Sequence, residues 1–292
     1  MRRKIKGIAN GDESIVNAAH QNRIAVLVAL IAGIVTVTLL FFTGAPEISG
    51  RVTLKGTPPA EIQIVLDPTS AKLRPNGLTT HHYLVSPNGG LANVFVWIKS
   101  GLTNYNSGAA TEPVVMEFRG ARFEPYVIGV LTNQPVRFAS SDPMLQNVHC
   151  TPRSSGNRGF NFAMAPRTAM IGEPWYKAIY RRLTLWRRPI SAGTRPVFGV
   201  AEPFVRVKCD VHPWEFGCIC VAGHPFFAVS DEDGAFRFPA GLPPGRYVIE
   251  ARHLKAGAVT QEIVIGRGEH KRLDFMLKVP TSSSPSEPSP PL

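Results

Sequence analysis

Apolar and polar residues alternate with a period of two along most of the chain after residue 46, a pattern typical of strands with one buried face. The first example, 47–54 (EISGRVTL), runs into the turn 56–59 (GTPP). The 26 Gly and 26 Pro residues favour short strands joined by turns. We therefore predict an all-β fold, with further strands at 62–66, 92–98, 114–118, 126–131, 135–139, 204–208, 218–221, 226–230, 235–238, 247–252, 260–265 and 272–277.

An uncharged apolar run at 24–43 (IAVLVALIAGIVTVTLLFFT) precedes the strands. A helix of this length spans about 30 Å, the thickness of a bilayer core. A cleaved signal peptide is the alternative, but its apolar region is about 7–15 residues long behind a short basic start. Here 23 residues precede the run, and Pro46 directly follows the one candidate cleavage site at Ala45. We expect an uncleaved transmembrane anchor.

Basic residues flank the N-terminal side of this run, namely Arg2, Arg3, Lys4, Lys6 and Arg23. They indicate a cytoplasmic segment at 1–23, since basic residues favour that side of a membrane. We expect a single-pass protein of a bacterial inner membrane, with its globular region in the periplasm or outside. The net charge of +11 would suit nucleic acid, but export of the globular region argues against such a partner.

One segment, 174–198, breaks the strand pattern with six basic residues and no acidic one. Its apolar residues Trp175, Ile179, Leu183 and Trp186 have helical spacing. Such a basic amphipathic helix can lie on an anionic membrane surface, or it can pack its apolar stripe on the protein. The residues offered to a membrane or a partner are Trp175, Lys177, Arg181, Arg182, Trp186, Arg187 and Arg188. At the other end, 279–292 has too little apolar content to pack and is expected to be a disordered tail.

The segment 208–215 (KCDVHPWE) carries the most chemistry. Cys209 and His212 have C-x-x-H spacing at the end of a predicted strand, and a thiolate with an imidazole suits a transition metal, copper above all. The alternative is a buried free cysteine beside a surface histidine.

The other cysteines form no C-x-x-C pair, so a thioredoxin-like motif and a zinc knuckle are not indicated. Cys218 and Cys220 would face the same side of a strand, which does not favour a bridge between them. A disulfide from Cys150 to either one and free core thiols both stay open.

The segments 142–149 (DPMLQNVH) and 209–214 (CDVHPW) resemble the ligand regions of amicyanin-type cupredoxins. Together with 91–102, 123–131 and 224–253, they resemble exported bacterial proteins that combine a cupredoxin-like domain with a carboxypeptidase-regulatory-like β-sandwich. The resemblance implies a Greek-key cupredoxin-like sandwich at 106–223, with the basic helix inserted in it. It also implies an immunoglobulin-like or transthyretin-like sandwich in two pieces, 47–105 and 224–278.

The same resemblance implies a copper site with an altered ligand set. The family places a histidine where this chain has Gln146, and a methionine where it has Glu215. The candidate ligands are therefore Cys209, His212 and Glu215, with Gln146 or His149. His149 has an odd offset from Gln146 along a strand, which turns it to the opposite face.

A second departure concerns positions that carry Cys and His in relatives. Two of these lie near Ser70 and Arg74, and two near Ala121 and Tyr126, and all four are absent here. If the relatives' cysteines pair, the resemblance implies that the two losses are mutually consistent and that the bridge is lost in this chain.

No P-loop, nucleophile elbow or dinucleotide glycine pattern is present, so we do not expect an enzyme. Two hypotheses follow. In one, a membrane-tethered copper protein carries one electron to a redox partner. In the other, a metal-free β-sandwich scaffold binds a partner protein, an envelope polysaccharide or other carbohydrate, or lipid.

Overall fold

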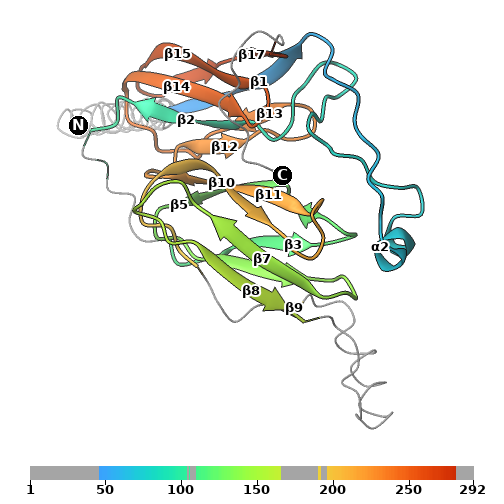
Figure 1. Ribbon diagram of the computed structural model, residues 1–292. Coiled ribbons are helices and arrows are strands. Elements are labelled where there is room, and N and C mark those ends of the chain that lie inside the picture. The colour runs from blue at the N-terminus through green and yellow to red at the C-terminus, as the bar shows by residue number, and fades with distance from the viewer. Residues whose placement is uncertain (1–45, 104, 106–109, 166–189, 192–195, 281–292) are drawn as a thin grey trace, which may run out of the picture.

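The computed structural model describes residues 46–103, 105, 110–165, 190–191 and 196–280 (Figure 1). Outside this part of the chain lie the expected segment 1–23, the expected anchor 24–43, the residues expected to bind a membrane or partner at 175–188, and 281–292 of the expected tail. Among the described residues, no helix combines the length and apolar content needed to cross a bilayer. Strands dominate, with one short helix, so the prediction of an all-β fold is confirmed.

Strands from both ends of the described chain build one sandwich, here called the composite sandwich. One of its sheets has the order β13-β1-β16, with β17 also paired to β1, and the other has the order β12-β2-β14-β15. The bounds are β1 (Glu47–Lys55), β2 (Phe95–Ser100), β12 (Phe227–Val229), β13 (Ala235–Arg237), β14 (Gly245–His253), β15 (Gly257–Ile265), β16 (His270–Arg272) and β17 (Phe275–Lys278).

The strands between them build a second sandwich, here called the central sandwich. Its sheets have the orders β5-β11-β10-β7-β8 and β4-β3-β6-β9. The bounds are β3 (Val114–Phe118), β4 (Phe123–Glu124), β5 (Val127–Leu131), β6 (Val136–Ser140), β7 (Gln146–Thr151), β8 (Phe160–Met164), β9 (Ile190–Ser191), β10 (Glu202–Lys208) and β11 (Phe216–Ala222).

Strand β1 joins the two pieces of the composite sandwich. It pairs antiparallel with β13 and parallel with β17. Gly50 is needed at this junction, because a Cβ there would lie 1.8 Å from the Leu273 carbonyl oxygen. The chain between β2 and β12 therefore leaves the composite sandwich and returns to it.

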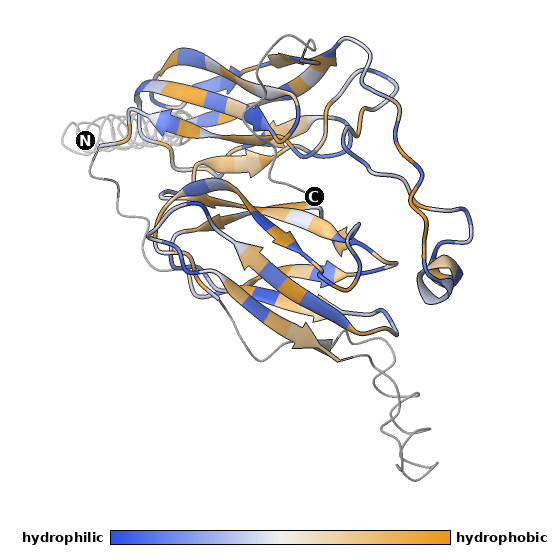
Figure 2. Ribbon diagram, viewed as in Figure 1, coloured by the Kyte–Doolittle hydropathy of each residue, from blue (hydrophilic) through white to orange (hydrophobic). Residues whose placement is uncertain are grey.

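The two sandwiches also pack against each other, so that four sheets share three apolar cores (Figure 1). Strand β2 turns Val96 and Ile98 into the composite core, and Phe95 and Trp97 toward the central sandwich. Strands buried on both faces read as continuous apolar runs rather than alternating ones. The orange stretches of Figure 2 follow such strands at the contact between the sandwiches.

Strand β11 has the same two-faced burial and accounts for its cysteines. Cys218 and Cys220 lie in the core between the sandwiches, whereas Cys150 of β7 lies in the core of the central sandwich. All four cysteines are free and buried. The disulfide considered between Cys150 and Cys218 or Cys220 is wrong, because β11 turns these thiols away from the core that holds Cys150.

A long excursion, residues 56–89, leaves the end of β1 and is here called the strap. It carries α2 (Pro68–Leu73), with Asp67 as its N-cap. The strand predicted at 62–66 is wrong: Ile62 and Val65 are 66% and 92% exposed, and one isolated bridge joins Gln63 to Thr79. An alternating pattern forms a strand only where a sheet edge and a core are available to it.

The segment 272–277, predicted as one strand, forms parts of two strands, β16 and β17. At the point where the partner of β1 changes from β16 to β17, the Leu273 amide donates to the Ser49 carbonyl. The strap also brings the segment around Arg74 close to the segment around Gly120. Arg74 Nε donates to the Gly120 carbonyl at 2.7 Å.

Phe95 tests the core between the sandwiches. It is 1% exposed and its ring centroid lies 5.6 Å from that of Phe227. Phe95→Ala should lower the free energy of unfolding by about 3–5 kcal/mol, because it removes an aromatic ring and leaves a cavity. Val264→Ala, at a 55% exposed position, is the control and should change it by less than about 0.5 kcal/mol. Equal effects of both in chemical denaturation would contradict this packing.

Candidate metal centre

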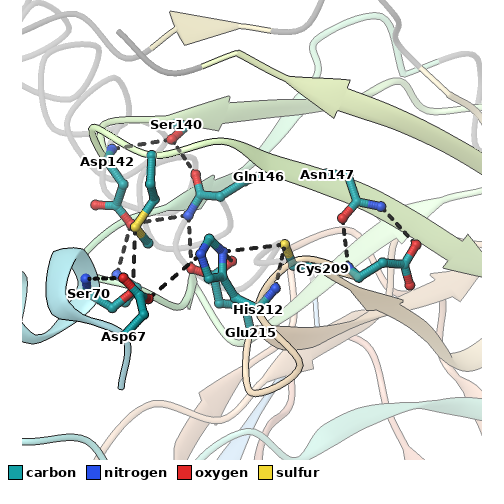
Figure 3. A network of polar contacts seen from close by, with 12 residues as sticks. Asp67, Ser70, Ser140, Asp142, Gln146, Asn147, Cys209, His212 and Glu215 are labelled. Atoms are coloured by element: carbon teal, nitrogen blue, oxygen red, sulfur yellow. Dashed lines mark hydrogen bonds and ion pairs between the residues drawn. The ribbon is translucent and has the colours of Figure 1, made fainter. Parts of the chain in front are cut away.

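The loop between β10 and β11 brings three potential metal ligands together. The Cys209 amide donates to the Glu215 carbonyl at 2.9 Å, and the Glu215 amide donates to the His212 carbonyl at 2.9 Å. This tight closure turns the side chains of Cys209, His212 and Glu215 to one side (Figure 3). Their ligand atoms all lie within 4.8 Å of one another, and the three residues are 0%, 7% and 0% exposed.

Cys209 supplies a sulfur that accepts backbone hydrogen bonds. The His212 amide donates to Sγ at 3.4 Å. Burial raises the pKa of the Cys209 thiol to about 11, although amides of Asn147, His212 and Val211 oppose the rise. A bound cation displaces the proton of a coordinating thiol, so these N–H groups would stabilise the thiolate that a metal requires.

His212 places its two ring nitrogens in different surroundings. Nδ1 lies 3.7 Å from Cys209 Sγ and 3.3 Å from Glu215 Oε2. Nε2 points away from the cluster, 3.8 Å from Asp67 Oδ2. Burial lowers the pKa of His212, which favours the neutral imidazole that binds metals.

Gln146 holds the carboxylate of Glu215 in place. Its Nε2 donates to Glu215 Oε1 at 2.9 Å, and its Oε1 accepts a hydrogen bond from Ser140 Oγ at 2.7 Å. The same Nε2 lies 3.3 Å from Oδ2 of the buried Asp142. In this orientation Gln146 turns its amide nitrogen, rather than a ligating oxygen, toward the cluster.

The second carboxylate oxygen of Glu215, Oε2, is buried and has no hydrogen-bond partner outside the cluster. Within the cluster it lies 3.3 Å from His212 Nδ1, and the Cys209 thiol hydrogen-bonds the Glu215 carboxyl. A buried carboxylate oxygen with so few partners costs free energy. Burial raises the pKa of Glu215 to about 7. A cation bound between Cys209 Sγ, His212 Nδ1 and this oxygen would satisfy all three groups, so the residues present fit a metal ion.

His149, the alternative to Gln146, lies outside this cluster. It sits on the other face of β7, where its Nδ1 lies 2.9 Å from Asp210 Oδ2. Asp210 also accepts from Asn147 Nδ2 at 2.9 Å, and its amide donates to Asn147 Oδ1 at 2.6 Å. His149 thus belongs to an outer network that anchors the first turn of the ligand loop.

Sequence reasoning missed the residues around the ligands. Asp142 and Asn147 lie within the segment 142–149, which resembles a ligand region. Their polar side chains in a predicted strand and turn could have indicated that they support the ligands. Asp67 lies far away in the sequence, in a segment predicted as part of the other sandwich, and no local pattern marked it.

Comparisons with known proteins show likeness in structure alone. No family model and no curated protein matches the chain. A copper-containing nitrite reductase from Thermus scotoductus is 14% identical over 42% of this chain and 25% of its own, with a TM-score of 0.28. This chain therefore spans about a quarter of that enzyme.

Two amicyanin structures cover a similar share of this chain. An oxidised variant is 17% identical over 44% of this chain and 98% of its own, with a TM-score of 0.27. A variant in the Cu(I) state is 17% identical over 44% and 98%, with a TM-score of 0.26. The likeness is confined to less than half of this chain.

Glu215 makes the stability of the metal-free protein depend on pH. A buried carboxyl whose pKa is raised from 4.5 to about 7 costs stability when it ionises, a cost absent below pH 4.5 and complete above pH 7. Glu215→Gln should therefore leave the free energy of unfolding nearly unchanged at pH 4 and raise it by up to about 3 kcal/mol at pH 8. Denaturation across this range, with the exposed Glu262→Gln as control, measures the difference; a difference independent of pH would contradict it.

Proposed function

We propose that this protein is a cupredoxin-like electron carrier that binds copper through Cys209, His212 and Glu215. The observation that carries the proposal is the buried Glu215 Oε2, which has no hydrogen-bond partner outside the cluster and lies within 4.8 Å of a thiol and an imidazole. Bound copper would supply one-electron chemistry there.

The donor set suits copper in its chemistry. Thiolate sulfur is a soft ligand that favours Cu(I), zinc and iron–sulfur clusters over harder cations, and imidazole nitrogen also binds copper well. Glu215 adds a charged oxygen, Oε2, and Gln146 holds the carboxylate in place by donating to its other oxygen, Oε1. The chain thus holds three different donors in place before any metal arrives.

Burial of the ligands favours a carrier over a catalyst. Catalytic metal sites keep a coordination position open to substrate. Here Cys209 and Glu215 are fully buried and His212 exposes 7% of its surface, so a substrate has little access to the cluster. An electron can cross such a closed site, whereas a substrate molecule cannot enter it.

The proposal extends to the cellular setting through the sequence. The run 24–43 supports a single-pass anchor in a bacterial inner membrane, with both sandwiches on the periplasmic or outer side. The composite sandwich is proposed to be the carboxypeptidase-regulatory-like domain. The basic segment 174–198 is proposed to touch the membrane or an envelope partner, and the electron acceptor is a second protein.

One observation favours the metal-free scaffold as a second candidate. Gln146 Nε2 already donates to Glu215 Oε1, so half of the carboxylate is satisfied without a cation. Under this alternative the buried cluster of Cys209, His212 and Glu215 binds no metal, and the sandwiches bind a protein, a polysaccharide or lipid.

Copper titration separates the two candidates. The parent protein should bind copper stoichiometrically and develop a visible thiolate-to-copper absorption band. Cys209→Ser should abolish the band because it removes the sulfur. His149→Gln is the matched control, since His149 lies on the outer network, and it should leave binding intact. If the parent protein binds no copper, or if the absorption band survives in Cys209→Ser, the electron-carrier proposal is wrong and the metal-free scaffold is favoured.

A further inference from the structure

The strap crosses from one sandwich to the other. It leaves the composite sandwich after Lys55 and returns at Gly90, which forms a bridge with Thr53 of β1. Between these points it extends past the central sandwich and places α2 beside the ligand loop (Figures 1 and 3). The metal centre is therefore bordered by a segment that belongs to the other sandwich.

Polar contacts, more than buried apolar surface, hold the strap against the central sandwich, since within the strap only Ser70 and Leu78 are buried. Arg74 Nε donates to the Gly120 carbonyl at 2.7 Å, and its Nη2 donates to the Arg119 carbonyl at 3.4 Å and lies 3.8 Å from Glu124 Oε1. Ser70 Oγ donates to Met144 Sδ at 3.5 Å, and His81 Nδ1 lies 3.3 Å from Arg122 Nη1. A segment with little buried apolar surface opens at low free-energy cost. Its docking can therefore respond to a modest change in interaction energy.

Asp67 is the residue of the strap that faces the metal centre. Its Oδ1 accepts hydrogen bonds from the amides of Thr69 at 2.8 Å and Ser70 at 3.2 Å, which caps α2. Its Oδ2 accepts a hydrogen bond from Ser70 Oγ and lies 3.8 Å from His212 Nε2, on the edge of the ring opposite Nδ1 (Figure 3). In the part of the chain that the structure describes, no other ion-pair partner lies at this nitrogen.

When a histidine binds a metal through one ring nitrogen, its tautomer and ring orientation depend on the group that lies next to the other nitrogen. A carboxylate there favours the tautomer whose N–H points at it, and it fixes the orientation of the ring. With the proton on Nε2 toward Asp67, the lone pair of His212 Nδ1 is free and lies among the donors of Cys209 and Glu215.

We propose that Asp67 is a positioning residue of the metal centre, which holds His212 by Nε2 so that Nδ1 faces Cys209 and Glu215. This inference rests on the proposed copper binding. Because the coupling of two equilibria is reciprocal, copper binding and docking of the strap favour each other by the same factor. The composite sandwich thus contributes a side chain to a site that lies in the central one.

The variant Asp67→Asn tests this directly, because it removes the charge and keeps the oxygen that caps α2. The copper affinity of the whole protein, measured by competition with a chelator, should fall about 10–100-fold, as expected for the partner of a ligating histidine. Glu262→Gln makes the same chemical change at an exposed position and should leave the affinity unchanged.

A second readout needs no metal. The ¹⁵N shifts of the His212 ring in metal-free protein should report a proton on Nε2 in the parent and a changed tautomer population in Asp67→Asn. Unchanged ring shifts overturn the proposal whatever the affinity does. Changed shifts with unchanged affinity in a copper-binding parent overturn it as well. If the parent binds no copper, the proposed function fails, and the ring shifts alone decide whether Asp67 positions His212.

Arg74→Met tests the reciprocal coupling at a residue that does not touch His212. Losing the hydrogen bond to Gly120 should loosen the strap and weaken copper binding, and copper should in turn slow amide exchange in the strap of the parent. The Ile64 amide, which donates to the Leu78 carbonyl at 2.9 Å, is a suitable reporter. Exchange there that is indifferent to copper in a copper-binding parent would contradict the coupling.

Discussion

Burial of β11 on both faces is the constraint on which the rest of the structure depends. One face packs Ile219 and Val221 into the central core, and the other packs Cys218 and Cys220 against the composite sandwich. Gly217 adds a close approach, since a Cβ there would lie 2.9 Å from the Tyr126 carbonyl oxygen. The strand has no freedom to slip, and the ligand loop that precedes it is held accordingly.

Within this rigid loop, burial and hydrogen bonds prepare the ligands for a metal. Burial opposes ionisation of both Cys209 and Glu215, so the metal-free site favours their neutral forms. A cation reverses that preference, because it compensates the charges that burial penalises. Gln146 and the amides around Cys209 orient the donors in advance. Burial of Cys209 and Glu215 therefore raises the free energy of the ionised, metal-free cluster and favours metal binding.

Local patterns predicted both strands with one buried face and strands buried on both faces. The segment 47–54 became β1, and the apolar run that includes Cys218 became part of β11. The alternating pattern at 62–66 does not form a strand, because no neighbouring sheet pairs with this segment. The C-x-x-H spacing located the ligand loop, but the orientation of Gln146 and the approach of Asp67 depend on contacts between distant segments. A disulfide to Cys150 was considered because spacing alone does not show which core a thiol enters.

X-ray absorption of the copper-loaded protein tests the central claim most directly, because it reports the atoms bound to the metal. The account predicts one sulfur together with nitrogen and oxygen neighbours. It also predicts that the sulfur is lost in Cys209→Ser and that one light neighbour changes in Glu215→Gln. A first shell of nitrogen and oxygen alone in the parent would contradict it, since copper would then be bound away from Cys209.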